Sequence, residues 1–199
     1  MSFFVGREET NKRGAVSRHA HETKSFTHEL WDWTKAILVA LLVIITLHQF
    51  GFNLSTVRGH SMDPTLREGD WLFVNKAITY FKAPKRGEIV ILKEPEKLAI
   101  PDRPLLVKRV IAIEGDEVQS RAGALYVNGD PVTEPYTNSP IEDGDFGPTE
   151  VGEGEIFVMG DNRHHAASAD SRVFGVIPTS LIEGRADFIL WPLDMAARL

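Results

Sequence analysis

The stretch "PLLVKRVIAIEGD", residues 104–116, predicts a β-strand that is interior to a sheet or half-covered. Alternate side chains of a strand share a face, so Lys108 lies on the same side as Leu106, Val110 and Ala112. The other face is also mostly apolar and carries Val107, Arg109, Ile111 and Ile113. A strand that is apolar on both faces is expected to be interior to the sheet or half-covered by neighbouring structure.

Lys108 is the unusual residue of this strand, because a lysine is costly to bury as a cation. Burial among apolar neighbours would lower its pKa from about 10.4 towards about 7, where the neutral amine is a competent base. The alternative is an edge-strand lysine whose stem packs on the sheet while its ammonium reaches water. The pattern of the strand alone leaves both interpretations open.

Short β-branched and aromatic runs continue through the chain after residue 54, separated by Gly, Pro and Asn. They are "DWLFVNK" (70–76), "GEIVILK" (87–93), "ALYVNGDPV" (124–132), "GEIFVMGD" (154–161) and "ADFILWP" (186–192). This spacing predicts a mainly β fold with one compact antiparallel sheet domain. Asn128-Gly129 predicts a type I′ hairpin, because both positions tolerate positive φ. Residues 133–154 are acidic and rich in turn residues, which predicts a long loop.

The long apolar run "WDWTKAILVALLVIITLHQFGF", residues 31–52, predicts a transmembrane anchor helix. Its strictly apolar centre, 36–47, covers only about 18 Å as a helix, which is short for a hydrocarbon core of about 30 Å. Aromatic residues at both ends suit the membrane interfaces and extend the usable span to about 22 residues. A buried core helix is the alternative. A cleaved signal peptide fits less well, because no small-x-small pattern follows the run.

Lys and Arg residues are unevenly distributed around the apolar run. Five precede Trp31, whereas only Arg58 and Arg67 lie in the twenty residues after Phe50. We therefore expect a single-pass protein with its N-terminus in the cytoplasm and the remainder outside the cytoplasmic membrane. The expected organisation is a mobile cytoplasmic tail at 1–30, the anchor at 31–52 and a β-rich extracytoplasmic domain at 53–199.

Composition disfavours several classes of function. The formal net charge of −6 argues against a nucleic-acid binder, which needs a clustered excess of Lys and Arg. Without cysteine the chain has no disulfide, no Cys-based zinc site and no thiol nucleophile. His19, His21 and Glu22 could ligate a metal, but a solvated tail is the better interpretation.

Ser61, within "VRGHSMDPTL" at 57–66, is a candidate nucleophile that needs a base to remove its proton. Neighbouring side chains of an extended chain point to opposite faces, so the ring of His60 should not reach it. His164 and His165 lie in a polar turn with no obvious carboxylate partner, which leaves a Ser-His-Asp triad weakly supported. The alternative is a structural serine in a Pro-initiated turn.

Five segments, taken together and in order, resemble the boxes of the bacterial type I signal peptidases, which are membrane-anchored Ser/Lys endopeptidases. They are "GHSMDPTL" (59–66), "GDWLFVNK" (69–76), "KRGEIVIL" (85–92), "KRVIAIEGD" (108–116) and "GDNRHHAASADSRVFG" (160–175). The resemblance covers most of residues 31–190. It implies removal of signal peptides from exported precursor proteins at the outer face of the cytoplasmic membrane, with no metal or organic cofactor.

The resemblance also implies roles for individual residues. Ser61 would be the nucleophile and Lys108 the general base, with the amine oriented by Ser168. Asp170 and Arg172 would pair to hold the last box in shape. Gly59 stands where some members have a serine hydroxyl, so the oxyanion would rely on the Ser61 N–H. An extended substrate with small residues before the cut would lie along Val57, Arg58, His60, Met62, Leu105 and Val107.

The last box departs from the family's pattern in its spacing. Family members usually leave two residues between "GDNR" and the serine, whereas this chain has four, His164–Ala167. The turn must therefore bulge, or Ser168 is displaced.

The expected partners are precursor proteins and the lipid bilayer, without nucleic acid. Two other classes stay open. A self-cleaving Ser/Lys protein of the repressor type would need a DNA-binding N-terminal domain, and the chain has a tail and an apolar run there instead. In a non-catalytic, membrane-tethered β module, Ser61 and Lys108 would be structural.

Overall fold

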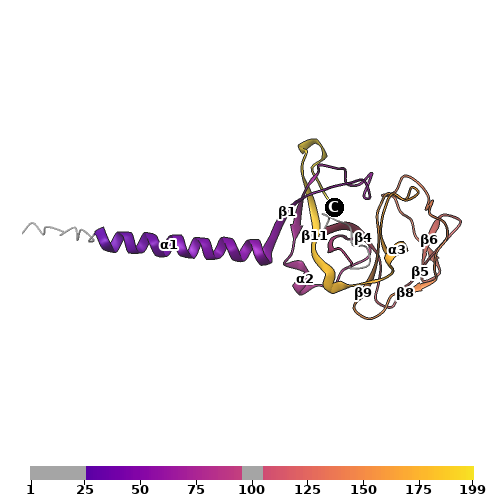
Figure 1. Ribbon diagram of the computed structural model, residues 1–199, viewed down its shortest axis with the longest axis horizontal. Helices are drawn as coiled ribbons and strands as arrows, with labels where there is room; N and C mark the ends of the chain where they lie inside the picture. The colour runs from indigo at the N-terminus through magenta and orange to yellow at the C-terminus, as the bar shows by residue number, and fades with distance from the viewer. Residues whose placement is uncertain (1–25, 96–104) are drawn as a thin grey trace, which may run out of the picture. The chain divides into compact units, whose positions relative to one another are not determined.

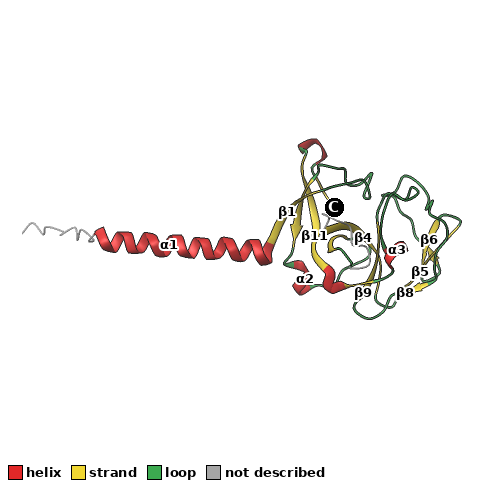
Figure 2. Ribbon diagram, viewed as in Figure 1, coloured by secondary structure: helices red, strands yellow, loops and turns green. Residues whose placement is uncertain are grey.

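The computed structural model describes residues 26–95 and 105–199, shown by position in the chain in Figure 1 and by secondary structure in Figure 2. Most of the expected tail at 1–30, including His19, His21 and Glu22, lies outside the described residues.

The apolar run forms helix α1 (Phe26–Thr46), followed by the short π-helix η1 (Leu47–Gly51). The helix begins before Trp31, with Glu29 in its first turn, where a carboxylate complements the helix dipole. None of its residues is buried, and Phe26–Gly51 contains an 18-residue window of mean hydropathy 1.9, so by length and composition it can cross a membrane. Phe52, the last residue of the expected anchor, is not helical and begins the first strand.

The remaining chain forms two antiparallel sheets, which confirms the mainly β fold. The larger sheet has the order β1-β2-β11-β3-β4-β9-β10, with β12 paired to β11, and the smaller sheet has the order β7-β6-β5-β8. The strands of the larger sheet are β1 (Phe52–Thr56), β2 (Trp71–Asn75), β3 (Ile89–Lys93), β4 (Leu105–Ile113), β9 (Glu155–Met159), β10 (Ile177–Pro178), β11 (Ile182–Trp191) and β12 (Ala197–Arg198). Those of the smaller sheet are β5 (Glu117–Arg121), β6 (Ala124–Val127), β7 (Asp130–Pro131) and β8 (Thr149–Glu150). Short helical turns connect them: α2 (Ile78–Phe81), α3 (Ser171–Phe174), η2 (Thr179–Leu181) and η3 (Leu193–Met195).

Strand β4 lies inside the larger sheet, between β3 and β9. Lys108 pairs with Val90 across the ladder and its side chain is only 3% exposed. The edge-strand alternative for this lysine is therefore wrong. Because both faces of β4 are covered, six of its nine residues are buried, as its two apolar faces predict.

The smaller sheet contains the predicted hairpin. Asn128 and Gly129 have φ values of 55° and 83°, which confirms a turn with two positive φ angles between β6 and β7. The expected loop at 133–154 is interrupted, because Thr149 and Glu150 form β8 and pair with Val118 and Glu117. The sequence pattern misses this strand because it is only two residues long.

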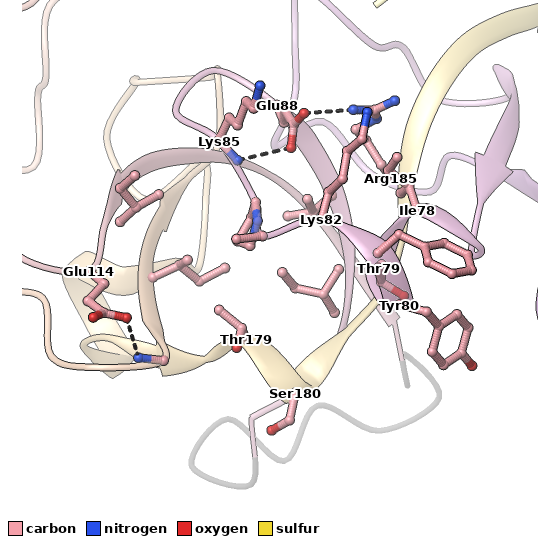
Figure 3. A pocket seen from close by; sticks show the side chains of 18 of the residues that line it. Ile78, Thr79, Tyr80, Lys82, Lys85, Glu88, Glu114, Thr179, Ser180 and Arg185 are labelled. Atoms are coloured by element: carbon pink, nitrogen blue, oxygen red, sulfur yellow. Dashed lines mark hydrogen bonds and ion pairs between the residues drawn. The ribbon is translucent and has the colours of Figure 1, made fainter.

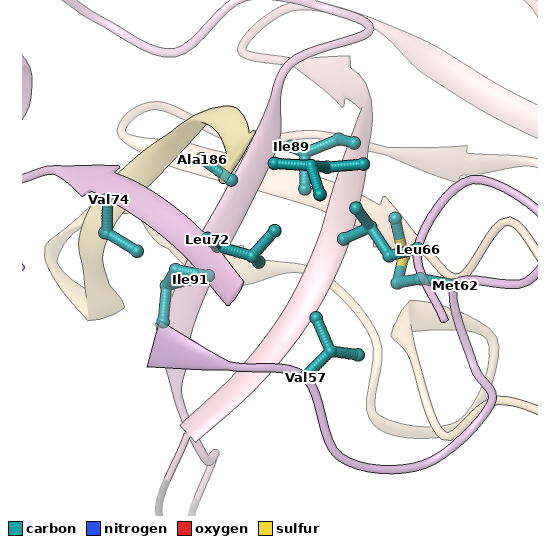
Figure 4. Packing of buried hydrophobic residues seen from close by; sticks show 9 residues of the cluster. Val57, Met62, Leu66, Leu72, Val74, Ile89, Ile91 and Ala186 are labelled. Atoms are coloured by element: carbon teal, nitrogen blue, oxygen red, sulfur yellow. The ribbon is translucent and has the colours of Figure 1, made fainter. Parts of the chain in front are cut away.

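One hydrophobic cluster of the core connects the segment around Ser61 to the larger sheet. Met62 and Leu66 are 1% and 0% exposed and pack with residues of β2, β3 and β11, as Figure 4 shows. These two side chains anchor the turn that contains Ser61, because withdrawing either would leave a cavity in a packed core. The cluster consists of Val57, Met62, Leu66, Leu72, Val74, Ile89, Ile91, Ala186 and Ile189.

Candidate active site

The structure brings Ser61 and Lys108 into direct contact. The Lys108 Nζ donates a hydrogen bond of 2.7 Å to Ser61 Oγ, although the two residues are 47 positions apart in the chain. Lys108 extends from the central strand β4, whereas Ser61 lies in a turn that follows Gly59, whose φ is 84°. Burial of Lys108 disfavours the ammonium form, so the arrangement can supply a neutral amine beside a hydroxyl.

The segment around Ser61 is a turn rather than an extended strand. The Asp63 N–H donates to the His60 carbonyl at 3.2 Å, and the Leu66 N–H donates to the Met62 carbonyl at 2.9 Å. The expectation that His60 and Ser61 lie in an extended chain, with their side chains on opposite faces, is therefore wrong. The His60 ring instead lies 3.2 Å from Asp63 and 3.6 Å from Glu68, with 67% of the side chain exposed.

Asn162 and Gly160, both from the "GDNR" turn, hold the backbone at the serine. The Asn162 N–H donates to the Ser61 carbonyl at 3.1 Å, and its side-chain amide donates to the His60 carbonyl at 2.9 Å. A Cβ on Gly160 would lie closer than 3.0 Å to both the Ser61 carbonyl oxygen and Ser168 Oγ. The glycine is thus required by close packing, because no side chain fits between the two serines.

Two buried ion pairs fix the same turn. Asp161 accepts two hydrogen bonds from Arg109, at 2.8 and 2.6 Å, and Arg109 is the residue that follows Lys108 in β4. Arg163 donates to the Gly160 carbonyl and pairs with Glu134 in the acidic loop. Sequence reasoning did not assign these residues a role, although the "GDNR" motif and the arginine beside Lys108 were the available signals.

The predicted pair of Asp170 and Arg172 is present. The Arg172 guanidinium donates to both carboxylate oxygens of Asp170 at 2.8 Å, and the Gly160 N–H donates to the same carboxylate at 3.0 Å. Burial acts to raise the pKa of Asp170, but the Arg172 hydrogen bond and charge outweigh it, so the pKa lies below its ordinary value.

Ser168 lies behind Gly160 and is 6% exposed. Its hydroxyl forms no direct hydrogen bond within the part of the chain that the structure describes, although it is near enough to Asp170 to favour the charged carboxylate. The orienting bond to Lys108 that the family resemblance implies is therefore not made in this arrangement.

The four residues between Arg163 and Ser168 form a bulged turn, but the bulge does not bring Ser168 into hydrogen bond with Lys108 as the resemblance implies. Ala166 has a φ of 56°, in the left-handed region. The expectation that His164 and His165 lack carboxylate partners is wrong: their rings lie 3.0 Å from Glu142 and 3.1 Å from Asp143. Sequence could not pair them, because both carboxylates come from the acidic loop more than twenty residues earlier.

Asp143 connects this bulged turn to the buried pair behind it. Its carboxylate accepts from the Ala166 N–H at 2.8 Å and from Arg172 Nη1 at 2.8 Å. Arg172 in turn binds Asp170, which accepts from Gly160. The acidic loop thus holds the extra residues in place beside Ser168.

A groove of about 480 Å³ runs past Ser61 and Lys108. All six residues expected to bind substrate line it: Val57, Arg58, His60, Met62, Leu105 and Val107. Gly59 lines it as well, together with Ala167 and Ala169 from the last box, which sequence reasoning did not single out. Asp170 and Arg172 are not among its lining residues and lie behind the site.

We expect Asp170→Asn to destabilise the fold by about 3 kcal/mol at pH 7, because the Arg172 guanidinium then loses the negative charge of its buried partner. A carboxylate with a lowered pKa stabilises the folded state above its ordinary pKa, and this contribution is lost as pH falls through the folded value. The difference between wild type and variant should therefore be constant near neutral pH and shrink below about pH 4. Urea unfolding of the full chain in detergent, followed by tryptophan fluorescence, measures it. A difference that grows in acid would contradict the assignment.

Comparison with known proteins identifies the family. Residues 30–191 match the model of the family described as signal peptidase, peptidase S26. Signal peptidase I of Bacillus licheniformis is 40% identical over 177 residues, covering 84% of this chain and 91% of that protein. Signal peptidase I T of Bacillus subtilis is 39% identical over 182 residues, covering 86% and 90%. A crystal structure of a signal peptidase I from Enterococcus faecalis aligns with a TM-score of 0.43 at 30% identity, covering 52% of this chain and 97% of that one.

The family match spans most of the chain, and the relatives are matched over nearly their whole length. The chain therefore belongs to the signal peptidases of family S26 and is a serine endopeptidase of the hydrolase class.

Proposed function

We propose that this protein removes signal peptides from exported precursor proteins with a Ser/Lys dyad, in which Ser61 is the nucleophile and Lys108 the general base. One observation carries the proposal: a buried amine lies 2.7 Å from a serine hydroxyl at the edge of a groove. A hydroxyl becomes a useful nucleophile only when a base within hydrogen-bond reach can take its proton. Lys108 meets that distance, and its burial favours the neutral form that a base requires.

In this mechanism the Ser61 hydroxyl attacks the scissile carbonyl as its proton passes to Lys108. The ammonium then protonates the leaving amine, and water activated by the same lysine hydrolyses the acyl-enzyme. The oxyanion would be stabilised by the Ser61 N–H, which donates no hydrogen bond within the described residues. Asn162 and Gly160 fix the direction of this backbone, since the first binds the Ser61 carbonyl and the second packs beside it.

The substrate would bind as an added strand along β4. Residues Leu105–Lys108 pair with β3 on one side, whereas the described pairing with β9 begins only at Arg109. The backbone of 105–108 can therefore pair with an extended peptide, while small side chains enter the groove. Ala167 and Ala169 add little bulk to that groove, which suits a substrate held close to the chain.

The proposed membrane anchor determines on which side of the membrane the active site lies. We propose that α1 crosses the cytoplasmic membrane with the N-terminus in the cytoplasm, because Lys and Arg are in excess before it. The β domain would then lie at the outer face, where signal peptides emerge. Tethering raises the effective concentration of the site towards substrates in the same membrane.

The test is cleavage of a signal-peptide-bearing precursor by the purified full chain in detergent, with the cut site identified by mass spectrometry. We expect one cut after a small-x-small sequence by the wild type and an intact precursor with Ser61→Ala. Incubation of the enzyme alone is the control for self-cleavage. An intact precursor with wild type, or a truncated enzyme as the only product, would contradict the proposal.

Ser168→Ala separates a catalytic-site role from a structural one. Because the hydroxyl makes no direct hydrogen bond and only favours the charged form of Asp170, its loss should change the unfolding free energy by less than about 1 kcal/mol. If the hydroxyl turns to orient Lys108 during the reaction, kcat should fall by about tenfold or more with little change in KM. Steady-state kinetics with thermal unfolding of the same preparations measures both. An unchanged kcat would remove Ser168 from the mechanism.

A further inference from the structure

A second groove of about 580 Å³ lies between α2 and the larger sheet, and none of its lining residues belongs to the groove at Ser61. Its apolar wall is formed by partly exposed aliphatic side chains of Ile78, Ile113 and Ile182. Lys82 and Lys85 lie at its rim, as Figure 3 shows. The proposed peptidase reaction makes no use of this groove.

The segment that borders it is the most basic in the folded domain. Residues 76–86, "KAITYFKAPKR", hold four cations and no carboxylate, although residues 36–199 as a whole carry a net charge of −7. Arg86 is engaged with Asp116. Lys76, Lys82 and Lys85 form no ion pair with any residue in the described ranges, so their charges remain available to a ligand.

Three carboxylates also line the groove, but each already has a donor. Glu88 binds Arg185 at 2.7 Å and accepts from the Lys85 N–H at 3.0 Å. Glu114 accepts from the Gly154 N–H at the other end of the groove, as Figure 3 shows, and Glu155 accepts from Gly152. The free positive charge is thus concentrated at the α2 end.

The α2 end lies where the apolar N-terminal segment stops. The N–H groups of Lys76 and Ala77 donate to the carbonyl of Gly51, the last residue of the candidate span, at 3.0 and 3.1 Å. Phe50 and Tyr80 are ring neighbours with centroids 6.3 Å apart, and Phe81 is 81% exposed. Exposed aromatic rings beside lysines, at the exit of a span, are typical of the membrane interface.

We infer that the groove binds one anionic phospholipid of the membrane that holds the anchor, with the phosphate at Lys82 and Lys85 and an acyl chain along Ile78, Ile113 and Ile182. The inference rests on the proposed anchoring of α1 in that membrane. It explains why an otherwise acidic domain presents three lysines without ion pairs, among its described residues, at this position. The bound lipid would fix the domain against the bilayer through a contact separate from the span.

The test is lipid binding by the purified full chain in detergent, followed by native mass spectrometry. The probes are dioctanoyl phosphatidylglycerol and dioctanoyl phosphatidylcholine, which differ in headgroup charge. We expect the wild type to bind the anionic lipid more tightly, and Lys82→Gln/Lys85→Gln to weaken that binding by about tenfold or more, because each lysine near an anionic headgroup contributes separately. The matched control, Arg67→Gln/Arg121→Gln, removes the same charge from other elements and should bind as wild type does.

Two further arms separate the possible outcomes. Glycerol 1-phosphate, which has the charge without acyl chains, should fail to compete at the concentration where the lipid saturates; full competition would show a phosphate site rather than a lipid site. Equal binding of the two lipids by wild type, or undiminished binding by the Lys82/Lys85 variant, would overturn the inference. Ser61→Ala should bind lipid normally while cleaving nothing, and the Lys82/Lys85 variant should cleave normally in detergent, so failure of the peptidase proposal is distinguishable.

Discussion

Lys108→Met should lower kcat/KM for precursor cleavage by about 10⁴-fold, to the level of Ser61→Ala, while the protein stays folded. Methionine has nearly the length of lysine without the amine, so it fills the same buried space and removes the base. Because the amine is 3% exposed, exchanging it for an apolar group should leave the unfolding free energy unchanged or raise it. Loss of activity with retained stability is the signature of a catalytic amine, since a structural one would show the reverse.

Lys93→Met provides the matched control for this experiment. Lys93 lies at the end of the neighbouring strand β3, is 61% exposed and pairs with Glu183 on the surface. Its exchange should change kcat/KM and stability little, because exposed ion pairs contribute less than about 1 kcal/mol. Single-turnover cleavage and thermal unfolding of the three variants distinguish the outcomes. Activity within tenfold of wild type in Lys108→Met would remove the dyad from the mechanism.

The central strand was predictable because its pattern carries the information locally. Lys108 has apolar neighbours on its own face and Ile111 and Ile113 on the other, a pattern that favours a covered strand but left the edge-strand lysine open until its burial was known. The hairpin at Asn128-Gly129 was predictable for the same reason, since both residues tolerate the positive φ that the turn requires. Ser61 was a candidate nucleophile from its own segment, and the family resemblance then connected it to a lysine 47 positions away, which no local pattern could do.

The parts that sequence reasoning missed all depend on contacts between distant segments. The segment "HHAA" does not itself indicate that Glu142 and Asp143 contact the rings of His164 and His165 and the backbone of Ala166. A run of acidic residues in a loop predicts only solvent-exposed charges. In the same way, the pairing of Arg109 with Asp161 connects strand β4 to the "GDNR" turn across 52 positions. The two-residue strand β8 forms by pairing with the edge of β5 that β6 does not occupy, a contact that its own sequence does not indicate.

These distant contacts have a common effect on the site. Arg109 ties the strand of Lys108 to the "GDNR" turn through Asp161, and Asn162 ties that turn to the backbone of Ser61. These hydrogen bonds connect the backbones of Ser61 and Lys108 through Arg109, Asp161 and Asn162. They fix the two backbones relative to each other without using the Ser61 or Lys108 side chain. Such a network holds reacting atoms to within a fraction of an ångström, which catalysis requires. Gly160 lies within this network, between the Ser61 carbonyl and the Ser168 side chain.

Gly160→Ala should therefore lower kcat/KM by about 100-fold or more, although it adds one methyl group and touches no substrate. The added Cβ would lie closer than 3.0 Å to a backbone oxygen of Ser61 and to the buried side chain of Ser168. Neither neighbour can move freely, because the Ser61 carbonyl is bound by Asn162 and Ser168 is almost fully enclosed. The backbone at the nucleophile must shift, and we expect kcat to fall more than KM changes, with a loss of about 1–3 kcal/mol in stability.

Gly152→Ala is the matched control, since there the added Cβ meets only the carboxylate end of Glu155, which can swing away. It should retain near wild-type kinetics. Steady-state assays with an internally quenched peptide, combined with urea unfolding, measure both variants. If Gly160→Ala loses stability but keeps its kcat, the glycine serves packing alone and the position of Ser61 does not depend on it. If kcat falls while most of the protein remains folded at the assay temperature, the close approach at Gly160 sets the geometry of the nucleophile.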